Sequence, residues 1–342
     1  MADIVKQTVG IDVAQDELVV SLGRMNHDTG TEIFASGTFS NSPKGLAELL
    51  KWTDKLATEG IRTSYVMEAT GVYHEKLAYF LCDQGRDVSI VLPNKISNYF
   101  RTLEVRTVTD RTASQAICRF GLERKLELWQ RPRKIFRDLK QLTRERDQLV
   151  IDRTALKNQL HAERTEAFPN QGSIKRITTR IQVINSHELE IRTEIAGLVR
   201  RDAELSRKID AIATIPGVGK LTAVITLAET NGFEHIRNKR QLVSYAGLDV
   251  RLKESGTLVK GKPRISKKGN RHLRKAMHMP ALAAMRFNEL HRALFVRLVS
   301  KHGIKMKAAV AVQRKILELI YIIYKTEKAF DRDYQSPPKD GI

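Results

Sequence analysis

Hydrophobic and polar positions in the first third of the chain form strand-like and helix-like segments that alternate. Five segments rich in apolar and β-branched residues predict strands over 7–13, 17–22, 32–39, 64–68 and 87–92. Asn41-Ser42-Pro43 has the composition of a helix cap and precedes an amphipathic helix over 44–58; another helix follows Gly71. Three strands followed by alternating helices and strands predict an α/β domain with a mixed sheet over residues 1–130.

The middle of the chain, residues 131–212, carries apolar residues in alternating three- and four-residue steps. The pattern runs over 135–160, is broken around Pro169, and resumes over 174–212. It predicts two long helices that pair as a coiled-coil hairpin. The hairpin is either a spacer or a dimerisation arm, and polar seam residues, which often fix register and partner, favour the arm. The polar members of the pattern are Arg146, Arg153, Glu188 and Asp202.

The last part, residues 213–330, is predicted to be mostly α-helical, and the tail over 331–342, which contains Ser336-Pro337-Pro338, is predicted to be frayed and flexible. The most apolar stretch, over 316–324, contains Glu318 and is far shorter than the roughly 18 residues that a membrane span needs. We therefore expect no membrane partner.

Charge points to nucleic acid as the partner. Lys and Arg outnumber Asp and Glu by 59 to 39, which gives a net charge of +20. Basic side chains that neutralise phosphates release condensed counterions, so nucleic acid is favoured over acidic proteins or membrane surfaces. The only two cysteines, Cys82 and Cys118, form no disulfide framework or CxxC pair. With no signal peptide at the N-terminus, this predicts a cytoplasmic protein.

Three carboxylates stand where a metal site can form. Asp12 ends the first predicted strand, Glu68 ends a later one, and Asp110 begins a predicted helix after the basic segment 101–106. Carboxylates that converge at one sheet edge bind Mg²⁺, which prefers oxygen ligands and can clamp a scissile phosphate. The strand Val9-Gly10-Ile11 leading into an acid and then a hairpin is what a ribonuclease-H-like metal site needs.

Three motifs together resemble those of the DEDD insertion-sequence transposases, which are relatives of the Piv invertase. They are Val9-Gly10-Ile11-Asp12-Val13-Ala14, Met67-Glu68-Ala69-Thr70-Gly71 and Thr109-Asp110-Arg111-Thr112-Ala113-Ser114, and the similarity extends over about 9–282. The resemblance implies a RuvC-like front domain whose acids, here Asp12, Glu68 and Asp110, coordinate metal as catalytic residues. It also implies a prokaryotic, nucleoid-associated DNA recombinase.

One position departs from the family pattern, which has a fourth acid three residues after the third. That position is Ala113 in this chain, and alanine cannot ligate metal. Two interpretations stay open: the chain is an inactivated variant, or a site with three acids is sufficient. Loss of one carboxylate is expected to weaken metal binding and to block cleavage, which favours the inactivated variant.

A glycine-containing turn and a cationic loop follow the predicted hairpin. Pro216-Gly217-Val218-Gly219-Lys220 matches a helix-hairpin-helix turn, in which backbone N–H groups approach phosphate, although a plain inter-helix turn has the same composition. The segment 251–275 holds ten Lys or Arg and one Glu, and predicts nucleic-acid contact. The nucleic-acid-binding residues expected from both segments are Gly217, Gly219, Lys220, Lys260, Lys262, Arg264, Lys267, Lys268, Arg271 and Arg274.

A serine in the cationic loop is a candidate nucleophile, because fixed cations offset the charge that develops on phosphorus. The residues alone do not decide between Ser255 and Ser266. The family resemblance favours Ser255, which matches a nucleophilic Ser-Gly motif before a basic stretch. The resemblance further implies that a structured guide (bridge) RNA pairs with donor and target DNA, that a 5′-phosphoserine link forms, and that the protein acts as a dimer or tetramer.

Two other functions compete with a serine recombinase. A RuvC-like metal-dependent nuclease would cut with activated water and leave no protein–DNA adduct. A non-catalytic nucleic-acid-binding protein would explain Ala113 directly. A purely structural coiled-coil scaffold is disfavoured, because it would not need the two flanking domains.

Overall fold

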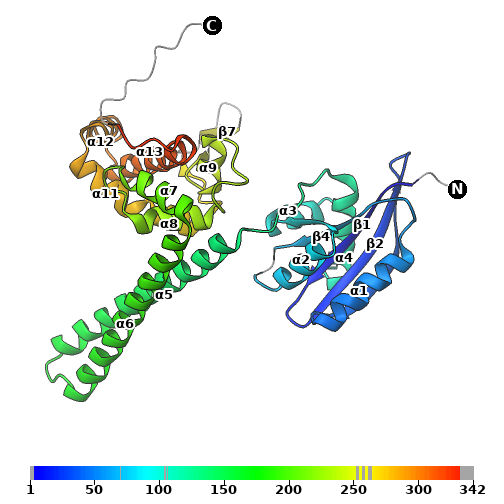
Figure 1. Cartoon of the computed structure of the whole chain (residues 1–342), viewed down its shortest axis with the longest axis horizontal. Coiled ribbons are helices and arrows are strands. Elements are labelled where there is room, and N and C mark those ends of the chain that lie inside the picture. The colour runs from blue at the N-terminus through cyan, green and yellow to red at the C-terminus, as the bar shows by residue number, and fades with distance from the viewer. Residues whose placement is uncertain are drawn as a thin grey trace, which may run out of the picture. The chain divides into compact units, whose positions relative to one another are not determined.

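The computed structural model describes residues 4–69, 71–103, 105, 107–251 and 264–331, and the backbone of 254–255 and 259–260. The chain divides into two compact units, Met1–Arg131 and Pro132–Ile342 (Figure 1). The predicted domain boundaries within the second unit stay predictions. Among the described residues, no helix has the length and apolar character needed to cross a membrane.

The first unit is built on a five-stranded mixed sheet with the order β3-β2-β1-β4-β5. β1 pairs antiparallel with β2 and parallel with β4; β2–β3 is antiparallel and β4–β5 is parallel. The predicted mixed sheet is therefore confirmed. The strands are β1 (Ile4–Val13), β2 (Glu17–Asn26), β3 (Thr31–Ser40), β4 (Thr63–Glu68) and β5 (Asp87–Val91), and the helices are α1 (Pro43–Leu56), α2 (His74–Asp83), α3 (Pro93–Phe100) and α4 (Asp110–Glu123).

Helix α3 was not expected, because Pro93 was interpreted only as the end of a strand. Pro93 is instead the first residue of this helix, after Leu92 in extended conformation. Proline suits that position, since its fixed φ matches the helix and the first helical N–H has no partner within the helix. The same residue therefore ends one element and begins the next.

Helix α4 lies directly on β1, and two glycines make this close approach feasible. A Cβ at Gly10 would stand 2.2 Å from the backbone nitrogen of Cys118, and a Cβ at Gly121 would stand 2.6 Å from Thr8 Cγ2. The buried Cys118 thiol donates to the Thr8 carbonyl at 3.2 Å. Later residues of α4 thus lie against earlier residues of β1, so the helix is antiparallel to the strand and its first turn points toward the end of β1.

The predicted hairpin consists of α5 (Lys134–Thr165) and α6 (Gln171–Arg201), which pack against each other (Figure 1). Its polar seam residues pair inside the hairpin: Arg146 lies 2.7 Å from the Glu188 carboxylate, and Arg153 also binds it. Burial alone would raise the pKa of Glu188, but the two guanidinium groups outweigh burial and lower it. The polar residues therefore fix the register of α5 against α6.

The second predicted helix of the hairpin is interrupted at Asp202, so a continuous helix to 212 was wrong. Asp202 is extended, and its side chain accepts a hydrogen bond from the Leu205 amide at the start of α7 (Ala203–Ala213). The periodic pattern hid this break, because the apolar spacing continues through it while aspartate favours the N-cap. Asp202 is a helix cap and not a seam residue.

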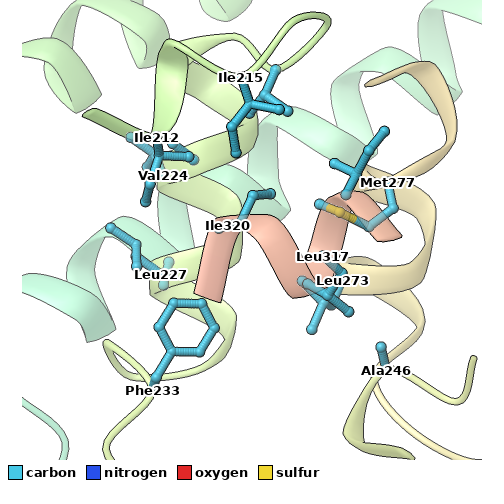
Figure 2. Close-up of a cluster of buried hydrophobic side chains, with 14 of the residues drawn as sticks. Ile212, Ile215, Val224, Leu227, Phe233, Ala246, Leu273, Met277, Leu317 and Ile320 are labelled. Atoms are coloured by element: carbon cyan, nitrogen blue, oxygen red, sulfur yellow. The ribbon is translucent and has the colours of Figure 1, made fainter. Parts of the chain in front are cut away.

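The rest of the second unit is mostly helical, as predicted. Its core includes residues of α5 and α6, since Phe136, Leu139 and Ile195 belong to the same hydrophobic cluster as the C-terminal helices. Leu227 of α8 and Ile320 of α13 lie in this cluster (Figure 2). The elements are α8 (Lys220–Glu229), α9 (Lys239–Tyr245), α10 (Arg271–Ala276), α11 (His278–Phe287), α12 (Glu289–His302) and α13 (Lys305–Thr326), with the short strands β6 (Val250–Arg251), β7 (Glu254–Ser255), β8 (Val259–Lys260) and β9 (Arg264–Ile265). The predicted flexible tail lies outside the described residues from 332 onward.

Candidate active site and nucleic-acid interface

Three carboxylates come together at the carboxyl end of the central strands. Ile11 of β1 pairs with Met67 of β4 in parallel register, so Asp12 and Glu68 follow each other on neighbouring strands. Asp110 is the first residue of α4, whose first turn points toward the same end of β1. The fold thus places the three predicted acids in one region of the first unit.

Asp12 lies half-buried beside two other negative charges, and both conditions change its pKa. Burial and, after it, the negative charges of Asp110 and Glu68 together raise this pKa from 3.8 to about 6, against a backbone hydrogen bond at Val13 that lowers it. A carboxylate held beside two others in a half-buried site is destabilised by them. A bound cation would remove this repulsion, so the donor set suits a divalent metal ion.

Asp12, Glu68 and Asp110 are neighbours, but their carboxylate groups do not converge on one point. Within the described part of the chain, no three acidic, histidine or cysteine side chains are arranged to hold a metal ion. Ala113 lies in the first turn of α4, three residues after Asp110, and its amide bonds to the Thr109 carbonyl at the helix cap. A carboxylate at this position would lie on the same helix face as Asp110, and its absence leaves the three carboxylates of Asp12, Glu68 and Asp110.

We expect Asp12→Asn to stabilise the first unit at neutral pH. Because folding raises the pKa of Asp12, stability from this group is greatest below pH 3.8 and falls as the pH rises through about 6. The full difference between the folded and unfolded pKa values of Asp12 corresponds to about 3 kcal/mol of stability. Because solvent screens this partly exposed carboxylate, we expect Asp12→Asn to raise the free energy of unfolding by about 1–2 kcal/mol at pH 7.5. Thermal unfolding followed by tryptophan fluorescence measures it selectively, since Trp52 and Trp129 are the only tryptophans and both belong to this unit.

The matched control is Asp16→Asn, which removes an equal charge from an exposed residue between β1 and β2. We expect this variant to change stability by less than about 0.5 kcal/mol. We also expect Mg²⁺ to stabilise the wild type at pH 7.5 but not Asp12→Asn. Equal melting temperatures for the wild type and Asp12→Asn at pH 7.5 and at pH 4 would contradict the carboxylate cluster.

In the second unit, the cationic loop rises from a two-stranded stem. Val250 pairs with Ile265, and the Ser266 amide donates to the Asp249 carbonyl at 2.8 Å. At the base of the stem, Gly269 has a φ of 150°, and a Cβ there would stand 2.4 Å from the Tyr245 carbonyl oxygen. The glycine is therefore required for close contact between the two sides of the stem.

The two candidate serines lie in different surroundings. Ser255 is in β7, where its backbone pairs with Val259 of β8. The Ser266 hydroxyl donates to the Asp249 carboxylate at 2.5 Å and accepts from the Lys268 amide at 3.3 Å. Ser266 thus has a defined structural task in the stem, as expected of a turn-forming serine. Asp249 was not singled out from the sequence, since no motif connects it to a serine 17 residues away.

The expected nucleic-acid-binding residues of the loop divide into exposed cations and a structural one. Arg274 donates to the Ala246 carbonyl at 2.9 Å and thereby supports the stem. Lys262 lies outside the described residues, as does the side chain of Lys260. The exposed cations beside the stem are Arg264, Lys267, Lys268 and Arg271. Their role in phosphate contact stays a prediction.

The glycine turn before α8 combines packing with an open helix start. Gly217, with a φ of 91°, fits against α11, where a Cβ would stand 2.8 Å from the Pro280 carbonyl oxygen. Gly219 has open space around it and begins α8 without a side-chain cap. Lys220 lies 2.7 Å from the Asp210 carboxylate. Close packing against α11 therefore explains the glycine at 217. The backbone amides after Gly219 are the part of the turn that is suited to bind phosphate.

Comparisons with known proteins decide the family. Residues 209–296 match the model described as "Transposase IS116/IS110/IS902 family", and residues 9–169 match the DEDD transposase model of IS110 type, described as "Transposase". The chain belongs to the IS110 family of DEDD transposases. This confirms the family that the three acidic motifs predicted, and identifies the chain as a DNA transposase or recombinase.

Related proteins cover nearly the whole transposase. The pilin gene-inverting protein of Moraxella bovis is 29% identical over 96% of this chain and 98% of its own length, and that of Moraxella lacunata is equally similar. The transposase for insertion sequence element IS1111A of Coxiella burnetii is 24% identical over 78% of each chain. The similarity therefore includes both structural units.

Among solved structures, Thermus thermophilus RuvC matches 36% of the transposase and 99% of its own chain, at 11% identity and a TM-score of 0.28. The fold assignment rests on the strand order and not on this score. The predicted fold class is confirmed: an α/β ribonuclease-H/RuvC-like N-terminal domain, a long helical hairpin and a mostly helical C-terminal part.

Proposed function

We propose that this transposase cuts and rejoins DNA at sites chosen by a structured guide RNA, with Ser255 as the nucleophile. The observation that carries the proposal is the cluster of Asp12, Glu68 and Asp110, where burial and the neighbouring charges together raise the pKa of Asp12 to about 6. Such repulsion among carboxylates is characteristic of a site that binds a cation. Without a bound cation, the repulsion lowers the stability of the folded protein.

Mg²⁺ is the proposed metal, held by Asp12, Glu68 and Asp110, because hard oxygen donors suit it. When bound, it would polarise the scissile phosphate and offset the charge that develops there. Ala113 leaves this donor set one carboxylate short of the family pattern. We therefore propose that the chain binds Mg²⁺ weakly and cleaves slowly, as an inactivated variant of its family.

The chemistry assigned to Ser255 is a phosphoryl transfer. Its hydroxyl oxygen forms a bond to phosphorus, the bond from phosphorus to the 3′ oxygen breaks, and the serine proton is transferred to that leaving oxygen. The product is a 5′-phosphoserine link and a free 3′-hydroxyl. The energy of the phosphodiester is kept in the adduct, so a second 3′-hydroxyl can attack it and rejoin the strands. Exposed cations beside the stem would stabilise the phosphate charge.

The proposed partners are donor and target DNA, the guide RNA and further copies of the chain. The net charge of +20 suits all three nucleic acids. The packed hairpin of α5 and α6 presents exposed apolar residues such as Ile151, Val183 and Leu189, which supports its use as a dimerisation arm. We propose a cytoplasmic, nucleoid-associated dimer or tetramer.

The experiment that tests this function is purification of the transposase expressed together with the DNA that flanks its element, followed by sequencing of the RNA bound to it. We expect one discrete structured RNA whose loops match both the element end and the insertion site. Adding that RNA and both DNAs should give protein-linked DNA on a denaturing gel. Cellular RNA bound in proportion to abundance, with DNA cut but never protein-linked, would favour a metal-dependent nuclease.

A further inference from the structure

A buried ion pair connects the arm to the C-terminal core. Glu229 ends α8 and is 2% exposed, and its two carboxylate oxygens accept from Nε and Nη2 of Arg144 on α5 at 2.7 and 2.9 Å. Burial would raise the pKa of Glu229, but Arg144 and Asn270 outweigh it and lower it. Glu229 is therefore ionised, and a buried charge of this kind requires its partners.

Glu229 binds both ends of the cationic loop, one through its carboxylate and the other through its backbone carbonyl. After the loop, Asn270 donates from Nδ2 to Glu229 at 2.6 Å, and its Oδ1 caps α10 by accepting from the amides of His272 and Leu273. Before the loop, the Tyr245 hydroxyl donates to the Glu229 carbonyl at 2.9 Å, and the Tyr245 carbonyl accepts from the Asn270 amide at 2.7 Å. The residues that flank segment 246–269 are thus bound to Glu229 and to each other.

Helix α5 also contacts α10, the helix that follows the loop. Asp147, three residues after Arg144, lies 2.5 Å from the Lys275 ammonium and 3.7 Å from the His272 ring nitrogen on α10. Arg144 and Asp147 share one face of α5, since residues three apart are neighbours on a helix. One turn of α5 therefore binds both α8, through Glu229, and α10, through Lys275.

We propose that Glu229, with Arg144 and Asn270, is a positioning cluster. It fixes the stem of the loop that contains Ser255 to α5 of the arm, at Arg144. The proposal rests on the proposed serine chemistry and adds a route by which the arm controls it. A change in the arm, such as assembly with another copy, would act on the stem through Arg144 and Glu229. None of the three residues contacts the reacting atoms in this proposal; they act through the loop.

The test compares Glu229→Gln with a matched control, Glu188→Gln. Both variants remove a buried carboxylate that binds arginine, but the Glu188 carboxylate lies within the hairpin and binds Arg146 and Arg153 of α5. We expect Glu229→Gln to slow protein–DNA adduct formation about 10- to 100-fold, as a displacement of about 1 Å does, with DNA affinity changed less than about threefold. Glu188→Gln should lower thermal stability and leave the adduct rate unchanged.

A second readout needs no DNA. Hydrogen exchange at the amides of His272 and Leu273 reports whether Asn270 still caps α10. We expect faster exchange there in Glu229→Gln and wild-type exchange in Glu188→Gln. Asn270→Ser is a milder variant, because serine is a good N-cap but is too short to reach Glu229. It should keep the protection of these amides and still slow the adduct.

The outcomes separate this proposal from the function on which it rests. Unchanged amide exchange in Glu229→Gln overturns the cluster, whether or not the wild type forms an adduct. If Glu229→Gln and Glu188→Gln slow adduct formation equally, Glu229 and Glu188 have only a stabilising role, and this result also overturns the positioning cluster. A wild type that cleaves DNA without an adduct overturns the serine chemistry alone, and the cleavage rate then replaces the adduct rate in the same comparison.

Discussion

Ser255→Ala should abolish the covalent protein–DNA product and lower strand exchange by about 10³-fold or more. The reason is that the proposed reaction requires a bond between the serine oxygen and phosphorus, and removing a nucleophile leaves only the contributions of binding and electrostatics. A denaturing gel with end-labelled donor DNA and the guide RNA measures it directly. DNA affinity should stay within about threefold of the wild type, because a single neutral hydroxyl contributes little to phosphate binding.

The matched control is Ser266→Ala, at the stem of the same cationic loop. Its hydroxyl bonds to Asp249 and to the Lys268 amide, so we expect a stability loss of about 1 kcal/mol and an adduct yield within about fivefold of the wild type. The opposite result has a specific meaning. If Ser255→Ala still forms the adduct and Ser266→Ala does not, the nucleophile is Ser266, with the Asp249 carboxylate placed to take its proton.

Ala113→Asp should raise Mg²⁺ affinity and DNA cleavage by about tenfold or more. The variant adds a fourth carboxylate one turn after Asp110 on the exposed start of α4, next to a cluster that already favours a cation. Titration of Mg²⁺ followed by the melting temperature of the tryptophan-containing first unit measures affinity, and the gel assay measures cleavage. The pKa of Asp12 should rise further in the metal-free variant, because another negative charge joins the cluster.

Ala113→Asn is the control for size and polarity without charge. We expect it to leave Mg²⁺ affinity within about twofold of the wild type, since an amide adds no negative charge. A wild type that already cleaves efficiently, with no gain in Ala113→Asp, would show that three acids are sufficient and that the chain is not an inactivated variant. No cleavage by either protein on a cognate substrate would favour a non-catalytic binding protein.

The sequence was most informative where periodicity and strand ends decide the structure. The strands of the mixed sheet and the two long helices follow from apolar spacing, and Asp12 and Glu68 meet because they end neighbouring parallel strands. The break at Asp202 and the helix after Pro93 were missed, because each depends on how one residue caps a helix and not on hydrophobic pattern.

The Arg144–Glu229–Asn270 cluster was beyond the sequence for a different reason. Its members are 85 and 41 residues apart, and only the packed core brings them together. The sole signal was a carboxylate at the end of the mostly apolar helix Lys220–Glu229, which is unusual for a buried position. The choice between Ser255 and Ser266 also could not be made from the loop composition, because both serines stand among the same cations.

The contact between α4 and β1 has a consequence for assigning function to newly sequenced genes. The distance from Asp110 to Asp12 depends on how closely α4 packs against β1, and Gly10 and Gly121 allow this close packing. A relative that retains all the acids but has a larger residue at either glycine would hold Asp110 farther from the strand end. Genome surveys that search for active members should therefore screen these two glycines together with the carboxylates.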